Sequence, residues 1–504
     1  MNFLGIIKTE SYKRGMILSV VFNIISKGIL FLLTVIIARY FGSDIKTDIY
    51  FFVFTSMVLF SGFINSIDTA VLIPESMRLR QEEGDNKAME FLNYFLLVYV
   101  LIGLLFTALM YFYGTAIFGL ISKFTTADII TYRNYFFAGS LFFIFNVLTN
   151  YLNNILASLK YFSLPMIISI VKSCVVIVCI FLLKEKYDVL SVIIGGLISY
   201  AVNLIIQIYI LHKVTGWKFT FKKPAIQKTT WSNVFYAELG QITTVASSMF
   251  PLYLLSGFGS GIISIMNYGK NIADIPNTLV SSQLANVSGI KLNEEVARND
   301  HAAMNETFLH TSRLMVFILV PVGCFMFVFA EPITALFYQR GSFTQQAVID
   351  SAKFMQLLSI TIFSIGINAV VTRIFISMQA IKQSLLYQVT LNLLLIFAIW
   401  LFTKSYGEYG YPYGVILINI INFIGMYFIC KKYFTTIEYG RLLKYTTAVI
   451  AANLPALALL YYFVLPAGIQ SFYKLSIGLC IYLVIFILMS RIKAFSVYGS
   501  NAKK

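Results

Sequence analysis

Charged residues are scarce in this sequence. Asp, Glu, Lys and Arg make up 12% of its 504 residues, whereas hydrophobic residues make up 59%. Because roughly a quarter of the residues of a soluble domain are charged, the composition excludes a soluble enzyme or scaffold of this length. Apolar runs of about 20 residues, which cross a bilayer as helices, recur along the whole chain. The sequence therefore predicts an all-α polytopic membrane protein.

Residues that bind metals or nucleotides are also few. The three histidines are scattered, and the five cysteines lie in or at the ends of apolar runs without metal-ligand spacing. No GxxxxGKS or GxxxxGKT loop is present to bind a nucleotide, and no loop is long enough for a catalytic site outside the membrane. We expect no metal, no cofactor and no enzyme activity, and we expect the cysteines to be small core residues.

Acidic residues are the scarcer charges. The sequence has 38 Lys and Arg against 22 Asp and Glu, a net charge of +16. A basic balance often indicates a polyanionic partner, but these charges lie in short loops between apolar runs. We therefore predict no nucleic-acid partner.

The apolar runs predict about fourteen membrane-spanning helices. They lie near residues 16–40, 49–73, 89–113, 132–157, 162–183, 189–212, 232–256, 262–289, 308–330, 346–377, 382–403, 411–430, 443–465 and 474–490. Lysines and arginines are enriched roughly two- to threefold in alternate loops, as they are on the cytoplasmic side of membrane proteins. Both termini are therefore predicted to be cytoplasmic.

Two motifs occur twice along the chain. FGSDI (41–45) recurs as FGSGI (258–262), and AIFGLISKFTTADI (116–129) aligns without a gap with ALFYQRGSFTQQAV (335–348), about 219 residues later. Internal symmetry of this kind is typical of transporters. Because one offset contains six predicted spans, both halves have the same orientation. We predict two six-helix lobes related by a pseudo-two-fold axis along the membrane normal, plus two C-terminal helices.

The repeat also predicts the domain boundaries. Spans 1–6 form an N-terminal lobe (1–212), a basic cytoplasmic linker follows (213–230), spans 7–12 form a C-terminal lobe (231–430), and two extra helices with a cytoplasmic tail end the chain (431–504). The linker is either an ordinary basic loop or a patch for anionic lipid headgroups. Two matched lobes that rock against one another would move a substrate across the bilayer.

Charged and amide side chains lie inside several predicted spans, where a charge costs roughly 2.5–3.5 kcal/mol on insertion scales. One helical face of the eighth span carries Asn267, Lys270, Asn271, Asp274 and Thr278. Such residues need a partner or a hydrated interior. The substrate-binding candidates are Lys27, Lys270, Asn267, Asn271, Asn146, Asn150 and Arg373.

Lys27 and Lys270 suit a diphosphate, because lysine binds phosphate as a point charge. Asp68, Glu238 and Asp274 are the candidates for ion coupling, since burial favours their protonated state. A structural alternative stays open: Lys270 and Asp274 are spaced to neutralise one another, and the asparagines can join helices.

The segments IIARYFGSDIKTDIYFFVF (36–54) and LFYQRGSFT (336–344) resemble signature regions of the MurJ/MviN-type lipid II flippases, in the multidrug/oligosaccharidyl-lipid/polysaccharide exporter superfamily. The segment IMNYGKNIADIPNTLVSSQLANVSGIKL (265–292) resembles the eighth-span region of that family. The resemblance implies a multi-pass protein of the bacterial cytoplasmic membrane that acts in peptidoglycan synthesis, cell-wall biogenesis and cell shape. Its partners would be membrane lipids and a polyprenyl-diphosphate lipid substrate, and we expect a monomer.

The resemblance has departures at cationic positions. Lys27 stands where a first-helix arginine is expected, which keeps the charge but loses the bidentate fork. Leu33 and Ser61 stand where further arginines are expected, and Lys270-Asn271 replaces an Asp-Arg pair. The substrate cavity would then be less cationic than in the family, which weakens the expectation of lipid II itself and raises O-antigen or capsular-type flippases as the alternative.

We predict a flippase that moves a polyprenyl-diphosphate-linked saccharide, most directly lipid II, from the inner to the outer leaflet by alternating access. Membrane potential, H⁺ or Na⁺ would drive it. The main alternative is an O-antigen, capsular or exopolysaccharide repeat-unit flippase. A drug/cation antiporter of the same superfamily is a further one.

Overall fold

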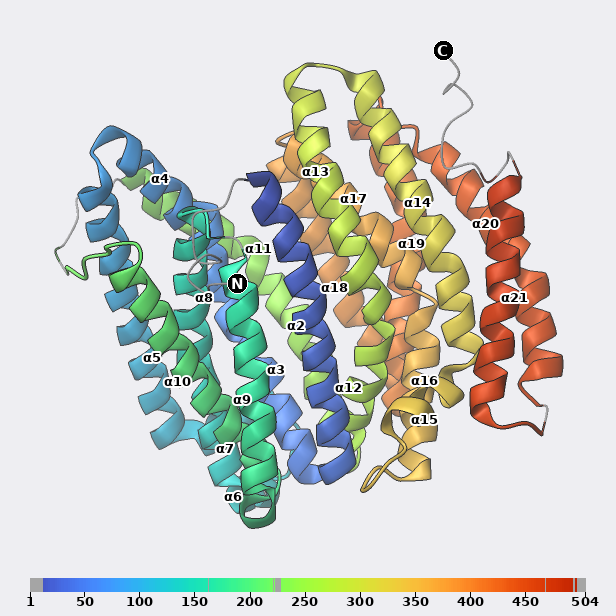
Figure 1. Ribbon diagram of the computed structural model, residues 1–504, viewed down its shortest axis with the longest axis horizontal. Helices are drawn as coiled ribbons and strands as arrows, with labels where there is room; N and C mark the ends of the chain where they lie inside the picture. Colours follow the sequence, from blue (N-terminus) through green and yellow to red (C-terminus); the bar gives the residue numbers. More distant parts are fainter. Residues whose placement is uncertain are drawn as a thin grey trace. The chain divides into compact units, whose positions relative to one another are not determined.

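The computed structural model describes residues 12–161, 163–220, 222, 228–466, 468–492 and 495, and every regular element in this part of the chain is a helix (Figure 1). The all-α prediction is therefore confirmed. The chain forms two compact units, unit 1 over Met1–Ser264 and unit 2 over Ile265–Lys504. The boundary lies within the first turn of the helix Ile262–Ala273.

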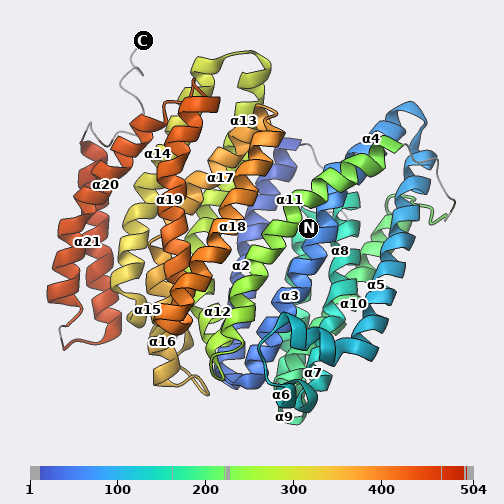
Figure 2. The same cartoon turned by 180° about the vertical axis from the view of Figure 1, so that it is seen from behind.

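Unit 1 is arranged around α3. Its helices are α2 (Tyr12–Phe41), α3 (Ile45–Ile67), η1 (Asp68–Leu72), α4 (Ile73–Glu82), α5 (Asp85–Ile121), α6 (Thr126–Thr131), α7 (Arg133–Ser140), α8 (Phe142–Ser158), α9 (Leu164–Tyr187), α10 (Leu190–Lys213) and α11 (Lys228–Leu255). α3 packs on α7, α8 and α11, and its first turns are buried on all sides. α11 lies against α3 in Figure 2, although the two are far apart in the sequence.

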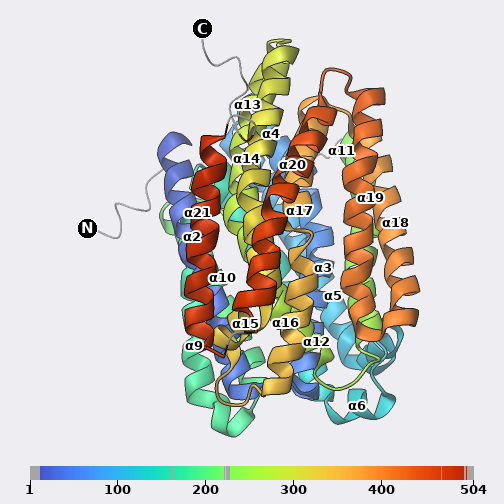
Figure 3. The same ribbon diagram turned by 90° about the vertical axis from the view of Figure 1, so that its right-hand side faces the viewer.

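Unit 2 is arranged around α14. Its helices are α12 (Ile262–Ala273, which begins in unit 1), η2 (Asn277–Ser281), α13 (Ser282–Ala297), α14 (His301–Val328), α15 (Ala330–Tyr338), α16 (Gln345–Ser359), α17 (Ile362–Ser377), α18 (Ile381–Tyr406), η3 (Gly407–Tyr409), α19 (Gly410–Tyr433), α20 (Tyr439–Leu459), η4 (Leu460–Val464) and α21 (Ser471–Arg491). α14 packs on α13, α16, α17 and α20. Figure 3 shows α18 and α19 side by side, and α19 also contacts α20.

Ten helices in the described part are long and apolar enough to cross a membrane, or eleven if the pair α16 and α17, bent by 47°, counts as one span. One of the ten, Lys382–Tyr433, contains both α18 and α19, which pack on each other after a turn at Gly407 (φ 60°). A polytopic membrane protein is thus confirmed, and the number fourteen stays a prediction.

The longer repeated segment ends on the same helix cap in both units. In unit 1, Thr125 Oγ1 accepts the N–H of Asp128 at 3.1 Å and begins α6. In unit 2, Thr344 Oγ1 accepts the N–H of Ala347 at 3.2 Å and begins α16. A threonine here satisfies one of the unbonded N–H groups of the first turn. Residues that the repeat aligns therefore have the same local role.

The phenylalanine before each cap is buried against an aromatic ring of its own unit. Phe124 meets Phe52 of α3 with ring centroids 5.3 Å apart, and Phe343 meets Tyr268 of α12 at 5.1 Å. Both ring pairs are nearly perpendicular, an arrangement that aromatic quadrupoles favour. The two copies of the repeat therefore share a buried aromatic contact as well as a backbone cap.

The shorter repeated motif differs between its copies. Asp44 of FGSDI caps its own helix, α3, by accepting a backbone N–H at 2.8 Å. The matching residue of FGSGI is Gly261 (φ 94°), where a Cβ would lie 2.8 Å from the carbonyl oxygen of Ser43. The buried carboxylate of Asp48 caps this second turn instead, accepting the N–H of Gly261 at 2.6 Å and the N–H and hydroxyl of Ser264 at 2.7 and 2.6 Å. The two motif copies therefore touch inside unit 1.

The cysteine prediction is correct only in part. Cys430 is buried, but Cys174 of α9 and Cys480 of α21 are exposed. Expecting these two in the core was wrong, because an apolar side chain in a membrane helix gains little from protein over lipid tails.

Candidate functional site

The polar face of α12 carries an ion pair. Lys270 Nζ lies 2.8 Å from Oδ2 of Asp274, and the Thr278 hydroxyl donates to the Asp274 carbonyl at 3.0 Å. The charged side chains stay 43% and 46% exposed. Asn267 and Asn271 are half-buried on the same helix. The structure thus adopts the pairing that the i, i+4 spacing allows, while leaving both charges within reach of a ligand.

Arg373 connects two helices of unit 2. Its Nη2 on α17 donates to Oδ1 of Asn286 on α13 at 2.5 Å. Its stem lies against Gly289, where a Cβ would come within 2.9 Å of the arginine Cδ. One turn further along, the Ser377 hydroxyl donates to Oδ1 of Asn293 at 2.6 Å. Arg373 is half-buried, so part of its guanidinium is committed to this helix contact.

Asp68 is fully buried in unit 1, at the start of the π-helical turn η1. The N–H of Ile73 bonds to the Asp68 carbonyl, and Pro74 follows with no N–H to extend an α-helical ladder. π-helical turns inside helices occur frequently at functional sites. The carboxylate accepts the hydroxyl of Tyr99 at 2.6 Å and Nδ2 of Asn154 at 3.3 Å. Among the described residues no ion pair involves Asp68, so neutral donors hold this acid.

Glu238 of α11 is bound to the same stretch of α3. The Ser66 hydroxyl, two residues before Asp68, donates to Glu238 Oε1 at 2.5 Å. The other oxygen, Oε2, and Oδ1 of Asn65 are buried atoms without a hydrogen-bond partner in the described structure. Buried acceptors without a donor are unfavourable and indicate a place for water, a proton or a cation. Asp68 and the hydrogen-bond partner of Glu238, Ser66, therefore lie on one segment, 65–68.

The other unit 1 candidates differ in accessibility. Lys27 is exposed on α2, and Asn150 is half-buried on α8. Asn146 is 6% exposed, and its Oδ1 accepts the hydroxyl of Tyr200 at 2.6 Å. Lys172 lies over the same ring, 3.7 Å from its centroid. Asn146 therefore serves the contact between α8 and α10, and Lys27 is the accessible cation of this set.

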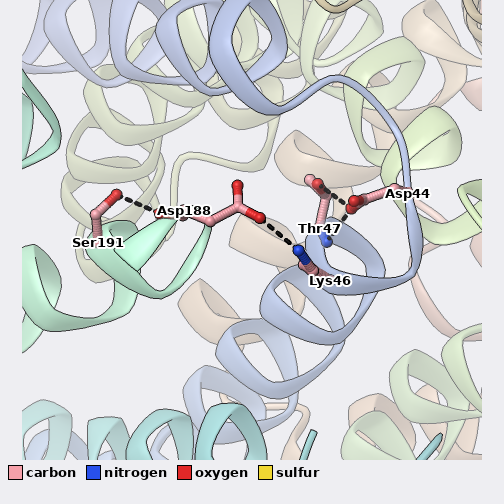
Figure 4. Close-up of polar contacts among 5 residues, drawn as sticks. All are labelled: Asp44, Lys46, Thr47, Asp188 and Ser191. Atoms are coloured by element: carbon pink, nitrogen blue, oxygen red, sulfur yellow. Dashed lines mark hydrogen bonds and ion pairs between the residues drawn. The ribbon is translucent and has the colours of Figure 1, made fainter. Parts of the chain in front are cut away.

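A second ion pair fixes the beginning of α3 (Figure 4). Lys46 Nζ lies 2.5 Å from Oδ2 of Asp188, in the turn between α9 and α10. Asp188 has a φ of 50°, and its carbonyl accepts the Ser191 hydroxyl at 2.6 Å. Beside it, Asp44 accepts the N–H and the hydroxyl of Thr47, both at 2.8 Å. Two segments of unit 1, residues 44–47 and 188–191, meet at this point.

Sequence reasoning missed the partners of the acids. Tyr99 and Asn154 hold Asp68, Ser66 holds Glu238, and Asp48 caps the second repeat turn. Asn154 follows the asparagine row of its span and gave a weak signal. No periodicity in the sequence pairs residue 68 with residues 99 and 154, because that pairing depends on how the helices are rotated.

The two units place their acidic groups differently. Unit 2 presents a half-exposed cation beside a carboxylate, which suits an anionic headgroup. Unit 1 holds the buried Asp68 and the half-buried Glu238 with neutral donors, which suits the binding of a proton or a small cation. In the part of the chain that the structure describes, no three His, Cys, Asp or Glu side chains gather as a metal site requires.

The chain resembles known proteins along most of its length. The family described as "Lipid II flippase MurJ" matches residues 37–489. A "Probable lipid II flippase MurJ" of Bdellovibrio bacteriovorus is 23% identical over 229 residues, 44% of this chain and 44% of the relative, so the chain spans less than half of that relative.

Solved structures show the same fold. The chain matches "Lipid II flippase MurJ, inward closed conformation" with a TM-score of 0.80 and 20% identity, over 94% of this chain and 99% of that one. It also matches an inward-facing multidrug resistance MATE family transporter of the MOP superfamily, with a TM-score of 0.63 and 15% identity, over 78% and 96%. Because the family match covers most of the chain, the resemblance is confirmed: the chain belongs to the lipid II flippase MurJ family, whose members are multi-pass membrane transporters and not enzymes.

Proposed function

We propose that this chain flips a polyprenyl-diphosphate-linked saccharide, most directly the peptidoglycan precursor lipid II, from the inner to the outer leaflet. Membership of the lipid II flippase MurJ family carries this proposal. An accessible lysine in each unit, Lys27 and Lys270, supports it.

In the proposed mechanism each unit contributes a cation to the diphosphate. Lys27 is exposed and binds directly, whereas Lys270 exchanges part of its bond to Asp274 for a phosphate oxygen. The helices that carry the polar faces also hold Asn267, Asn271 and the half-buried Asn150. Two further residues hold neighbouring helices together: Arg373 joins α17 to α13, and Asn146 joins α8 to α10. The lipid tail stays in the bilayer while the headgroup crosses.

Ion binding would reset the transporter. Asp68 and Glu238 take H⁺ or Na⁺ in unit 1, and Asp274 does so when the diphosphate draws Lys270 away. The orphaned oxygen of Glu238 supports this assignment. Membrane potential is an alternative driving force, and no other cofactor is needed.

The proposed topology has fourteen spans in the bacterial cytoplasmic membrane. Two six-helix lobes (1–212 and 231–430) are joined by the linker 213–230, followed by 431–504. Both termini are cytoplasmic, in keeping with the Lys and Arg bias of alternate loops. The protein works as a monomer with membrane lipids around it.

A second candidate is a flippase for an O-antigen, capsular or exopolysaccharide repeat unit. Leu33 and Ser61, which stand where arginines are expected, are 7% and 1% exposed. These positions are packed in unit 1 and supply no cation, so a less anionic headgroup would suit the chain. A drug/cation antiporter would instead need carboxylates where Lys27 and Lys270 stand.

Complementation separates these candidates. Cells depleted of their own lipid II flippase should regain growth and lipid II export when they express this chain. Failure at normal membrane abundance, together with rescue of a strain that lacks an O-antigen flippase, would replace lipid II by the second candidate.

A further inference from the structure

Unit 1 contains a large apolar cavity that the proposed transport residues do not use. Its volume is about 780 Å³, and α3, α5, α8 and α11 bound it. The lining is hydrophobic throughout, with Phe60 and Ile67 on α3 and Ile242 and Tyr253 on α11. Ile242 is 53% exposed, so the cavity opens to the surface of the unit.

Water is a poor occupant of this space. A buried water needs two to four polar partners, and an apolar cavity of roughly 150 Å³ already stays dry and binds hydrocarbon. The tyrosine hydroxyl of Tyr253 is the one polar side-chain group among the lining residues. Hydrocarbon is therefore the matching chemistry.

The length of the cavity fits one membrane leaflet. Along α11 the lining runs from Ile242 to Tyr253, twelve residues whose eleven rises of 1.5 Å span roughly 16 Å. This is about half of the roughly 30 Å hydrocarbon core. An acyl chain of a phospholipid has this reach, whereas the polyprenyl chain of the proposed substrate is longer than one leaflet.

A cation lies at the Tyr253 end. Lys123 Nζ is 5.3 Å from the centroid of the Tyr253 ring, and the Lys123 N–H donates to Ser256 Oγ at 2.7 Å. A Cβ on Gly257 would lie 2.9 Å from the Lys123 side chain, so the absence of a side chain there leaves room for the lysine stem. The Lys123 residue is exposed and belongs to no ion pair within the described ranges.

We propose that this cavity binds one acyl chain of an anionic phospholipid, whose headgroup phosphate pairs with Lys123. Lysine binds phosphate as a point charge, and the cavity supplies a hydrocarbon slot directly beside it. In the proposed orientation Lys123 faces outward, so the lipid comes from the outer leaflet. Bound lipid would stabilise the contact between α3 and α11.

Photo-crosslinking tests the site without relying on transport. The full chain is placed in vesicles of phosphatidylethanolamine and phosphatidylglycerol that contain a little phosphatidylglycerol with a diazirine near the end of one acyl chain. After irradiation, mass spectrometry locates the labelled peptides. We expect labels to concentrate on residues 60–67 and 242–253.

Filling the cavity provides the decisive variant. Ala246→Trp should lower labelling of these peptides by about tenfold, because the indole occupies the place of several buried methylenes. Ile205→Trp is the matched control on the exposed face of α10, outside the lining, and should change nothing. Met249→Trp is a second filling variant should Ala246→Trp elute abnormally in gel filtration.

Reversing the charge tests the headgroup contact. Lys123→Glu should lower labelling about fivefold, the effect of one lysine near an anionic lipid surface, whereas Lys186→Glu on α9 should leave it unchanged. Even labelling of all exposed helices, or labelling that Ala246→Trp and Met249→Trp do not reduce, would refute the site. Displacement of the probe by an equimolar polyprenyl diphosphate would assign the cavity to the substrate tail and overturn the phospholipid.

Discussion

The two units share a local plan but handle charge in opposite ways. Thr125 and Thr344 cap helices in the same manner, each after a buried phenylalanine. Unit 1, however, buries Asp68 among neutral donors, whereas unit 2 leaves Lys270 half-exposed beside Asp274. The two copies of a repeat keep the same backbone conformation and core residues, because packing depends on both. Their polar residues can differ between the copies. In our account each unit contributes one lysine to the headgroup, and unit 1 adds a buried acid, Asp68, that binds the ion.

Charge reversal at Lys270 should have the largest effect on transport. Lys270→Glu removes a phosphate contact and places a second carboxylate one turn from Asp274, so we expect a roughly hundredfold loss of flipping. Lys27→Glu should cause a smaller loss, since its exposed charge is more screened. Lys404→Glu, at the end of α18, is the control, and equal losses for all three variants would argue against a specific diphosphate site.

The two repeat turns should differ in how strongly their caps stabilise the fold. Asp48→Ala leaves two N–H groups and a hydroxyl of the second turn without their acceptor in unit 1, and should cost about 2 kcal/mol. Asp44→Ala removes an ordinary helix cap and should cost about 1 kcal/mol. Denaturant unfolding in mixed micelles measures both. The reverse order would mean that the Asp48 contact is not formed in the folded protein.

Neutralising the acids should separate ion binding from headgroup binding. Asp68→Asn keeps the shape but removes the titrating group, and should slow ion-driven flipping about tenfold, within the usual range of coupling between two sites. Asp274→Asn frees Lys270 and should instead tighten binding of a soluble diphosphate. Titration calorimetry and flipping under an imposed ion gradient measure the two effects. Weaker diphosphate binding by Asp68→Asn, or no tightening of it by Asp274→Asn, would contradict these roles.

The ion pair at the start of α3 should have the smallest effect. Lys46 and Asp188 are 33% and 48% exposed, and exposed pairs contribute at most about 1 kcal/mol. Lys46→Ala should therefore lower stability by less than that amount, with the difference vanishing at high salt. The charge swap Lys46→Asp with Asp188→Lys should recover the loss. A larger loss of stability that salt does not change would show that Lys46 stabilises unit 1 by something other than its ion pair with Asp188.

Local features were predictable from the sequence, and contacts between distant segments were not. Each predicted apolar segment is helical over most of its described residues, because length and hydropathy decide a membrane helix. The pairing of Lys270 with Asp274 follows from spacing of four residues on one helix. The repeat correctly marked Thr125 and Thr344 as equivalent.

Three features could not be predicted from the sequence. The bonds from Tyr99 and Asn154 to Asp68 depend on how three helices are rotated. The capping of the FGSGI turn by Asp48 depends on two motif copies that meet in space. α4 continues to Glu82 and α5 begins at Asp85, beyond the predicted spans, because polar ends of long helices extend past the apolar runs that hydropathy detects.

The central claim is that this chain flips a polyprenyl-diphosphate-linked saccharide with one lysine from each unit. The most direct test reconstitutes the purified protein in vesicles with fluorescent lipid II and measures how fast a membrane-impermeant quencher gains access to the inner-leaflet label. The account predicts rapid access with the unmodified chain and a large loss with Lys27→Glu or Lys270→Glu. Access no faster than in protein-free vesicles, or full activity in both variants, would contradict it.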